Sequence, residues 1–214
     1  MNRRTMPATA TLAAAVALVL TGCSSDSEPD DRIKGAGQGE DTSSPSARAT
    51  PTAPAKMADF GLPDDLDVEI ESNTTGDKAK DQILKEQAES LMARQRLYVD
   101  LDTNSRYLTR YYGGEAREFY VADVKKAKSE GRTITGTYRY YDRKVTKNTD
   151  DLVIVTYCED RSRADAKDVT SGKTRKTKPS PEDFIFNTAT LRKTEHDTWL
   201  VQSFRGEGGA AACR

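Results

Sequence analysis

The stretch Ala127-Lys128-Ser129-Glu130-Gly131-Arg132-Thr133-Ile134-Thr135 decides the fold, because the spacing of apolar residues changes within it. Before Gly131 the apolar residues recur with the 3.6-residue period of a helix, and after it they alternate with a period of two. Helical and extended segments are therefore separated along the chain. This order predicts an α+β domain in which N-terminal helices pack on one face of an antiparallel sheet of about four strands.

Three helices are expected before Gly131, over residues 78–101, 105–112 and 115–130. The first carries an apolar stripe through Leu84, Leu91 and Tyr98, which indicates a face that packs on a core. Asp77 stands before this helix in the position of an N-cap. The pair Gly113-Gly114 is expected to end the second helix.

Four strands are expected after Gly131, over residues 132–147, 151–158, 183–194 and 198–205. The second of these is the most apolar, which favours a central place in the sheet. Residues 159–181 are expected to form a long polar excursion. Residues 57–73 are expected to be a lead-in that forms a turn or a strap across the surface.

A separate signal occupies the N-terminus. Arg3 and Arg4 precede an apolar run from Ala8 to Leu20, which has the length of a signal-peptide core and is too short to span a bilayer. The next residues, Leu20-Thr21-Gly22-Cys23, resemble the lipobox of bacterial lipoproteins. The resemblance implies that residues 1–22 are removed and that Cys23 is acylated. The protein would then be anchored in the lipid of the cell membrane, on its outer, extracytoplasmic face. The alternative is a secreted protein with an ordinary cleavage site near Cys23.

Residues 23–56 are expected to be a disordered tether, because they are polar and have almost no large apolar side chain. This tether could lift the domain off the lipid surface or be a linker of no specific length. Residues 57–214 remain as the folded α+β domain. The whole chain has 33 basic and 34 acidic residues and a net charge of −1, which gives no electrostatic footprint for nucleic acid.

The cysteines suit an oxidising compartment. With Cys23 assigned to lipid, Cys158 and Cys213 remain, and a pair in an exported protein favours a disulfide. The bridge would pin the C-terminal tail to a strand. The alternative, a reactive Cys158, has no plausible partner, because the only histidine is His196.

Short motifs in the domain resemble exported lipoproteins of the actinobacterial type. They are Tyr111-Tyr112-Gly113-Gly114, Cys158-Glu159-Asp160, Thr170-Ser171-Gly172 and Trp199-Leu200-Val201, in that order. Such proteins are commonly assigned the nuclear transport factor 2-like cone, the fold of ketosteroid isomerase and the SnoaL-like cyclases. The resemblance covers about Asp77 to Cys213 and lacks the hairpin that many members have between the second and third helices. It implies a curved sheet, a pocket between sheet and helices, and a homodimer formed through the sheet. It implies no activity, because this fold hosts enzymes and non-enzymes.

Tyrosines are the candidate pocket residues. Tyr111, Tyr120, Tyr138 and Tyr140 are the candidate lining of an aromatic pocket, although tyrosines also serve simply as large packing residues. An isomerase-type mechanism would use a carboxylate, for which Asp123 and Asp142 are candidates. No spacing of aspartate and tyrosine indicates such a site. We therefore assign no catalytic residue, and His196 is expected in a solvated turn.

Three further patterns are set aside. The run Ser171-Gly172-Lys173-Thr174 lacks the glycine that a phosphate loop needs five residues before Gly172. The basic run 173–178 is expected to be a solvated loop, with contact to anionic envelope polymer or lipid headgroups as the alternative. The acidic residues Glu159, Asp160, Asp165 and Asp168 lack the ligand order of a calcium loop, so no metal or other cofactor is assigned.

These observations predict a membrane-anchored, non-enzymatic module that binds a protein or another component of the cell envelope. A small-molecule-binding lipoprotein is the first alternative. An isomerase- or cyclase-like enzyme is the second, and it requires a buried carboxylate in a pocket.

Overall fold

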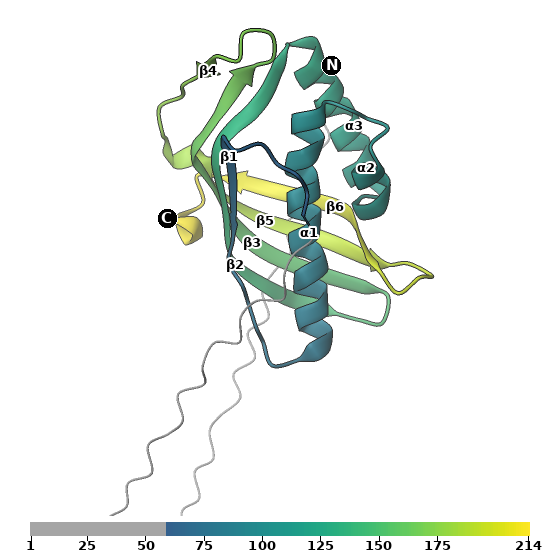
Figure 1. Ribbon diagram of the computed structural model, residues 1–214. Helices are drawn as coiled ribbons and strands as arrows, with labels where there is room; N and C mark the ends of the chain where they lie inside the picture. The colour runs from purple at the N-terminus through teal and green to yellow at the C-terminus, as the bar shows by residue number, and fades with distance from the viewer. Residues whose placement is uncertain (1–58) are drawn as a thin grey trace, which may run out of the picture. The chain divides into compact units, whose positions relative to one another are not determined.

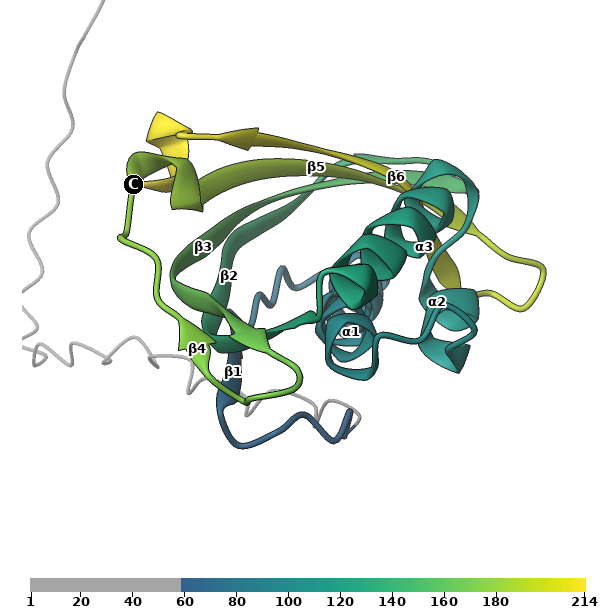
Figure 2. The same cartoon turned by 90° about the horizontal axis from the view of Figure 1, so that it is seen from above.

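The computed structural model describes residues 59–214, so the predicted signal peptide, Cys23 and the tether lie outside the described residues. Three helices lie inside the curve of a sheet, as Figures 1 and 2 show. They are α1 (Lys78–Asp100), α2 (Arg106–Tyr111) and α3 (Gly114–Ser129). The predicted α+β class and the packing of the helices on one face of a curved sheet are confirmed.

The sheet has six strands in the order β1-β2-β3-β5-β6, with β4 paired to β3. Four long strands form the predicted antiparallel meander: β2 (Arg132–Asn148), β3 (Leu152–Asp168), β5 (Phe184–Lys193) and β6 (Trp199–Gly208). Two strands were not predicted: β1 (Leu66–Ile70) and β4 (Thr174–Arg175). Short 3-10 turns, η1 (Pro181–Asp183) and η2 (Ala211–Cys213), precede β5 and follow β6.

Two expectations from the sequence need correction. The lead-in contains β1, which pairs with β2 in parallel over Leu66–Ile70. The expected polar excursion is in its first half a continuation of β3, which pairs with β2 as far as Asp168. Here Arg163, Asp165 and Lys167 form ion pairs, whereas Ala164 packs against the core. A strand with one charged face looks polar in sequence even when its other face is buried.

The sheet curves because the pairing register between β2 and β3 is irregular. Their register shifts at three places, and Asp142 in β2 has a φ of 50° at one of them. Gly136 has a φ of 87°, and a Cβ at this position would lie 2.2 Å from the Arg163 carbonyl oxygen. Bulges of this kind bend a strand and increase its twist. The bend wraps the sheet around α1 and α3, as the view in Figure 2 shows.

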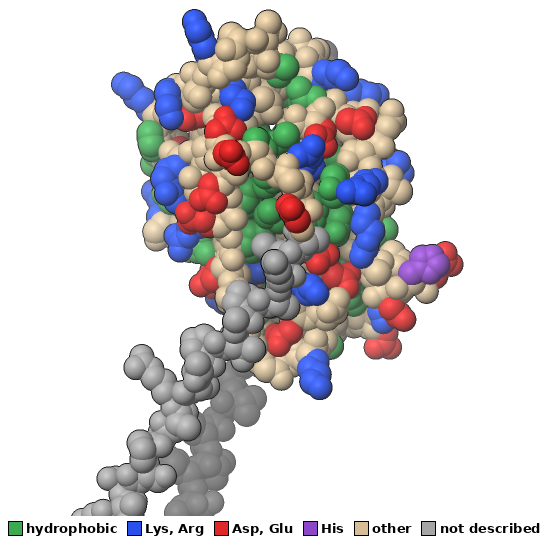
Figure 3. Space-filling model, viewed as in Figure 1, with side chains coloured by type: hydrophobic (Ala, Val, Ile, Leu, Met, Phe, Trp, Pro, Cys, Tyr) green, Lys and Arg blue, Asp and Glu red, His purple; other side chains and the backbone are tan. Residues whose placement is uncertain are grey.

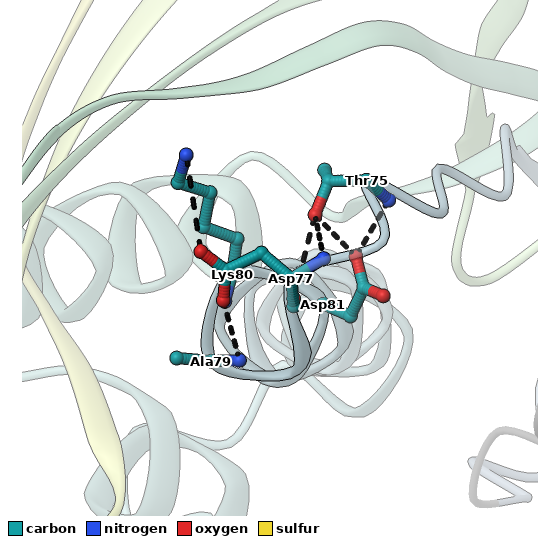
Figure 4. A network of polar contacts seen from close by, with 5 residues as sticks. All are labelled: Thr75, Asp77, Ala79, Lys80 and Asp81. Atoms are coloured by element: carbon teal, nitrogen blue, oxygen red, sulfur yellow. Dashed lines mark hydrogen bonds and ion pairs between the residues drawn. The ribbon is translucent and has the colours of Figure 1, made fainter.

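The first helix begins where the sequence predicts. The Asp77 carboxylate accepts hydrogen bonds from the backbone N–H groups of Ala79 and Lys80, at 2.9 and 3.2 Å. Asp81 closes the turn from the other side by accepting from the backbone and hydroxyl of Thr75 (Figure 4). These bonds satisfy donors that a helix start otherwise leaves without partners, so the predicted N-cap is confirmed.

The core lies between α1, α3 and the concave side of the sheet. Leu84, Leu91 and Leu97 of α1 are buried, as are Val153 and Val155 of β3. No helix in residues 59–214 is long and apolar enough to cross a membrane.

The predicted disulfide is confirmed and ties the end of the chain to the middle of the sheet. Cys158 of β3 and Cys213 of η2 are bonded, with their Cα atoms 5.5 Å apart. Tyr141 supports the same contact by donating its hydroxyl to the carbonyl oxygen of Cys213. The C-terminal residues are therefore pinned to the sheet by a covalent bond and a hydrogen bond.

Candidate functional site

A polar cluster lies in the interior, between α1 and the concave face of the sheet. The Arg94 guanidinium donates to both carboxylate oxygens of Glu159, at 3.0 and 2.6 Å. The Glu159 side chain is 2% exposed and that of Arg94 is 14% exposed. A buried carboxylate is tolerated where a cation and hydrogen bonds neutralise it. Each member of the pair therefore neutralises the buried charge of the other.

Tyrosines surround this ion pair. The Arg94 guanidinium lies 5.9 Å from the centre of the Tyr140 ring, and Gln95 donates its side-chain amide to the Tyr140 hydroxyl. Burial raises the pKa of Tyr120 to about 12, although the positive charge of Arg94 acts in the opposite direction. Burial also raises the pKa values of Tyr138 and Tyr140. These hydroxyls therefore stay protonated at physiological pH.

A second buried arginine fixes α1 to the sheet without a salt bridge. Arg143 of β2 donates to the side-chain oxygen of Gln87 at 2.8 Å and to the carbonyl oxygen of Glu71 at 3.1 Å. It also donates to the carbonyl oxygen of Leu84 within α1. Burial lowers the pKa of Arg143 to about 10. The guanidinium therefore joins a helix, a strand and the segment after β1.

The polar groups of the interior are almost fully paired. Within residues 59–214, only the Asn73 side-chain oxygen is buried without a hydrogen-bond partner. Tyr112 donates its hydroxyl to the Ser90 carbonyl oxygen at 2.5 Å, and Glu86 accepts from the Trp199 backbone at 2.7 Å. A network in which each member is satisfied is rigid. The interior polar cluster can therefore hold α1 firmly on the sheet.

The four tyrosines of the predicted pocket are all buried in one core cluster. Tyr120, Tyr138 and Tyr140 are buried in the core around Arg94. Tyr111 packs against Phe60, with ring centres 6.0 Å apart, and donates its hydroxyl to Glu89. A pocket lined by these side chains stays a prediction.

The candidate carboxylates lie in different places. Asp123 of α3 accepts a hydrogen bond of 2.5 Å from Tyr98 of α1. Asp142 is exposed and forms an ion pair of 2.6 Å with Lys144. His196 lies in the turn between β5 and β6, with 83% of its side chain exposed. The structure does not bring these three residues together.

The acidic residues set aside as a calcium loop are divided between the interior polar cluster and ion pairs with the basic run. Glu159 is in the core, whereas Asp165 and Asp168 pair with Lys176 and Arg175, each at 2.8 Å. These two bases belong to the basic run, which folds back on β3 through β4. Among residues 59–214, no group of three or more metal-binding side chains is arranged to hold an ion.

A surface hollow of about 360 Å³ lies where the start of α1 meets the β2–β3 and β5–β6 turns. Its lining comes from three separate parts of the chain: Ala79, Gln82, Ile83, Asn148, Thr149, Asp150, Lys193, Asp197 and Trp199. Ile83 and Trp199 are buried and form its apolar floor, while the rim residues are exposed. A hollow of this size can accept a small molecule or one unit of a polymer.

Charge is mixed over the rest of the surface. Figure 3 shows basic and acidic side chains interspersed on the face seen in Figure 1, with apolar surface between them. Many form ion pairs, such as Arg163 with Glu69 at 3.1 Å and Lys167 with Asp65 at 2.6 Å. This face offers no broad region of one sign that would attract a polyanion.

No protein-family model and no curated protein matches the sequence. Among solved structures, the chain is similar to a ketosteroid isomerase-like protein from Erwinia carotovora atroseptica. The sequence identity is 12%, the match covers 62% of this chain and 97% of that one, and the TM-score is 0.42. It is also similar to a protein from Catenulispora acidiphila, at 11% identity, 59% and 88% coverage and a TM-score of 0.36.

A third similar structure is the intermembrane space region of the chloroplast protein ARC6. Its identity is 13%, its coverage is 57% of this chain and 95% of that one, and its TM-score is 0.36. At these identities and scores, no functional residue is carried over from these proteins to this chain. The candidate sites rest on the contacts described above.

Proposed function

We propose that this protein is a membrane-anchored, extracytoplasmic binding protein that performs no catalysis. The lipobox at Leu20-Thr21-Gly22-Cys23 supports the anchor, since it resembles the acylation signal of bacterial lipoproteins. The balanced charge and the lack of a transmembrane helix among residues 59–214 are compatible with a domain held at the membrane by lipid alone.

One observation carries the non-catalytic part of this proposal. Glu159 is a carboxylate buried near tyrosines, as the base of an isomerase-type mechanism would be. Both of its oxygens accept hydrogen bonds from Arg94. A general base has to reach the proton that it removes. Since Arg94 engages both oxygens, the interior polar cluster suits the support of a fold better than proton transfer.

The anchor can be tested by one substitution in the full chain. Cys23→Ala removes the thiol that would be acylated, and we expect the protein to move from the membrane fraction to the soluble exported fraction. Ser24→Ala is the matched control, and it should stay with the membrane. Retention of the Cys23→Ala variant in the membrane would contradict a lipid anchor.

Binding of a small ligand is a second candidate, and the surface hollow favours it. The hollow has an apolar floor, a polar rim and a volume within the range of small-molecule sites. It would act alongside the anchor, because the hollow is formed by the folded domain and the anchor by residues before it. Binding of a component of the cell envelope combines both features.

A further inference from the structure

We propose that the surface hollow between the start of α1 and the β2–β3 and β5–β6 turns binds a neutral saccharide. This inference rests on the proposed binding function and names the chemical class of its ligand. It is carried by the floor of the hollow, by the hydrogen-bonding groups on its rim, and by its charge.

The floor is apolar and held in place. Trp199 and Ile83 supply it, with 8% and 2% of their surface exposed. Beneath them the Glu86 carboxylate accepts from the Trp199 backbone N–H at 2.7 Å and from the Gln82 side-chain amide at 2.6 Å. This buried carboxylate joins β6 to α1, so the floor is set before a ligand arrives. A preformed floor lowers the entropy cost of binding.

The rim carries hydrogen-bonding groups that remain free for a ligand. Gln82 uses its amide N–H on Glu86, which leaves its side-chain oxygen as an acceptor. Asn148 offers an amide that both donates and accepts, and Asp150 offers a carboxylate. Thr149 is different, because its hydroxyl donates to the Leu152 carbonyl oxygen at 2.9 Å. The free groups therefore come from both sides of the hollow.

The charge of the rim disfavours an anion. Lys193 and Asp197 neutralise each other in an ion pair of 2.8 Å, and Asp150 leaves the lining with a net negative charge. The start of α1 does not offset this negative charge with free N–H donors for an anion, because Asp77 already accepts from the N–H groups of Ala79 and Lys80 (Figure 4). A phosphate or carboxylate ligand would meet Asp150 with no free cation in the lining.

A saccharide satisfies the three features together. Its ring offers a C–H face that can pack on an apolar floor, and its hydroxyl groups donate and accept at once. Amide and carboxylate side chains match such hydroxyls, and a neutral ligand avoids the repulsion of Asp150. A purely apolar ligand would leave the polar rim without partners, which costs binding free energy.

Trp199 makes the test specific, because it is the only tryptophan of the chain and it lines the hollow. The full chain would be titrated with the neutral disaccharides N,N′-diacetylchitobiose and maltose while tryptophan fluorescence is recorded. Inorganic phosphate and putrescine serve as the anionic and cationic probes. We expect a saturable change with a disaccharide and none with phosphate.

Two adjacent aspartates provide the matched variants. Asp150→Ala removes a rim carboxylate, and loss of a hydrogen bond to a charged group should weaken saccharide binding about tenfold. Asp151→Ala changes a neighbour that is absent from the lining and pairs with Arg192. At the lining it removes only a 3.5 Å hydrogen bond from Thr149, whose hydroxyl keeps the Leu152 carbonyl oxygen as acceptor, so this variant should bind as the unaltered protein does. Circular dichroism would check that both variants are folded.

Several results would overturn the proposal. The first is the absence of a saturable fluorescence response to either disaccharide. The second is a saturable response to putrescine or phosphate alone. The third is an equal loss of saccharide affinity in the two aspartate variants. Such a failure would leave the membrane fractionation of Cys23→Ala unaffected. Conversely, a Cys23→Ala variant that stayed in the membrane could still bind the disaccharide, so the two proposals fail separately.

Discussion

Arg94 of α1 and Glu159 of β3 form a two-pronged ion pair in the interior, at 3.0 and 2.6 Å, across 65 residues of sequence. The pair joins the central helix to the central strand where both are buried. The sequence pattern does not predict this pair, because Arg94 interrupts the apolar face of a helix and Glu159 follows the end of an apolar run.

Removal of one member should be costly. Glu159→Gln leaves the Arg94 charge buried without its counter-ion, and such a loss typically lowers the free energy of unfolding by about 3 kcal/mol or more. Urea denaturation measures the change, with the exposed Glu207→Gln as the matched control. The double variant Arg94→Met with Glu159→Leu should recover much of the loss, since it removes both charges. A Glu159→Gln variant as stable as the control would contradict a structural role for the pair.

The disulfide should stabilise the folded protein by restricting the conformations of the unfolded chain. Cys158 and Cys213 are 55 residues apart, and closing a loop of this length restricts the unfolded state by about 4 kcal/mol. We expect the double variant Cys158→Ala with Cys213→Ala to unfold at lower urea concentration by a corresponding amount. Reduction of the unaltered protein by dithiothreitol should have the same effect. An unchanged midpoint of urea unfolding in both experiments would refute a stabilising role for the disulfide.

Alkaline pH should unfold the domain in a cooperative step. Burial raises the pKa of Tyr120 to about 12 and raises those of Tyr112 and Tyr140 as well, whereas unfolded tyrosines titrate near 10.0. Since the folded chain keeps protons that the unfolded chain loses, this stability is complete below pH 10 and decreases as the pH rises above it. Arg143, whose pKa burial lowers to about 10, acts in the opposite direction, but it is one group against several.

Tyrosinate absorbance and far-ultraviolet circular dichroism, followed together, measure this effect. The buried tyrosines should ionise together with loss of secondary structure, and the same chain in concentrated urea gives the unfolded titration. Ionisation of all tyrosines near pH 10 with the helices intact would show that these hydroxyls are solvated.

The N-cap of α1 gives a smaller and local effect. Asp77→Ala removes the acceptor for the N–H groups of Ala79 and Lys80, which should lower the free energy of unfolding by about 1 kcal/mol. Asp67→Ala, at an exposed acidic position in β1, is the control, because it removes the same charge away from the cap. Hydrogen exchange at the first turn of α1 should accelerate in the Asp77 variant only. Equal effects of the two substitutions would mean that charge, rather than the cap, is responsible.

Elements held by local contacts were predicted more accurately than elements held by distant ones. Helix boundaries followed from the apolar stripe and from Asp77, because a helix is held by bonds within itself. β1 was missed, because five residues that pair in parallel with a distant strand carry little local signal. The second half of β3 was missed because Arg163, Asp165 and Lys167 form ion pairs and make the segment look like a polar loop.

The buried polar residues were the least predictable part. Gln87, Gln95 and Arg143 are nearly inaccessible, yet such side chains are most often exposed. Their burial depends on partners in other elements, such as the Tyr140 hydroxyl for Gln95 and Gln87 for Arg143. The surface hollow escaped prediction for the same reason, since its lining comes from three separate segments.

The sequence by itself determined the order of helices and strands, the change of period at Gly131, the capping of α1 and the pairing of Cys158 with Cys213. These features rest on local spacing, on backbone chemistry and on the small number of cysteines. Only the tertiary structure decided that Glu159 pairs with Arg94, that Tyr111 packs on Phe60, and that Trp199 forms the floor of a hollow. Such contacts arise when distant segments are folded together, and the burial that creates them has no counterpart in the linear chain.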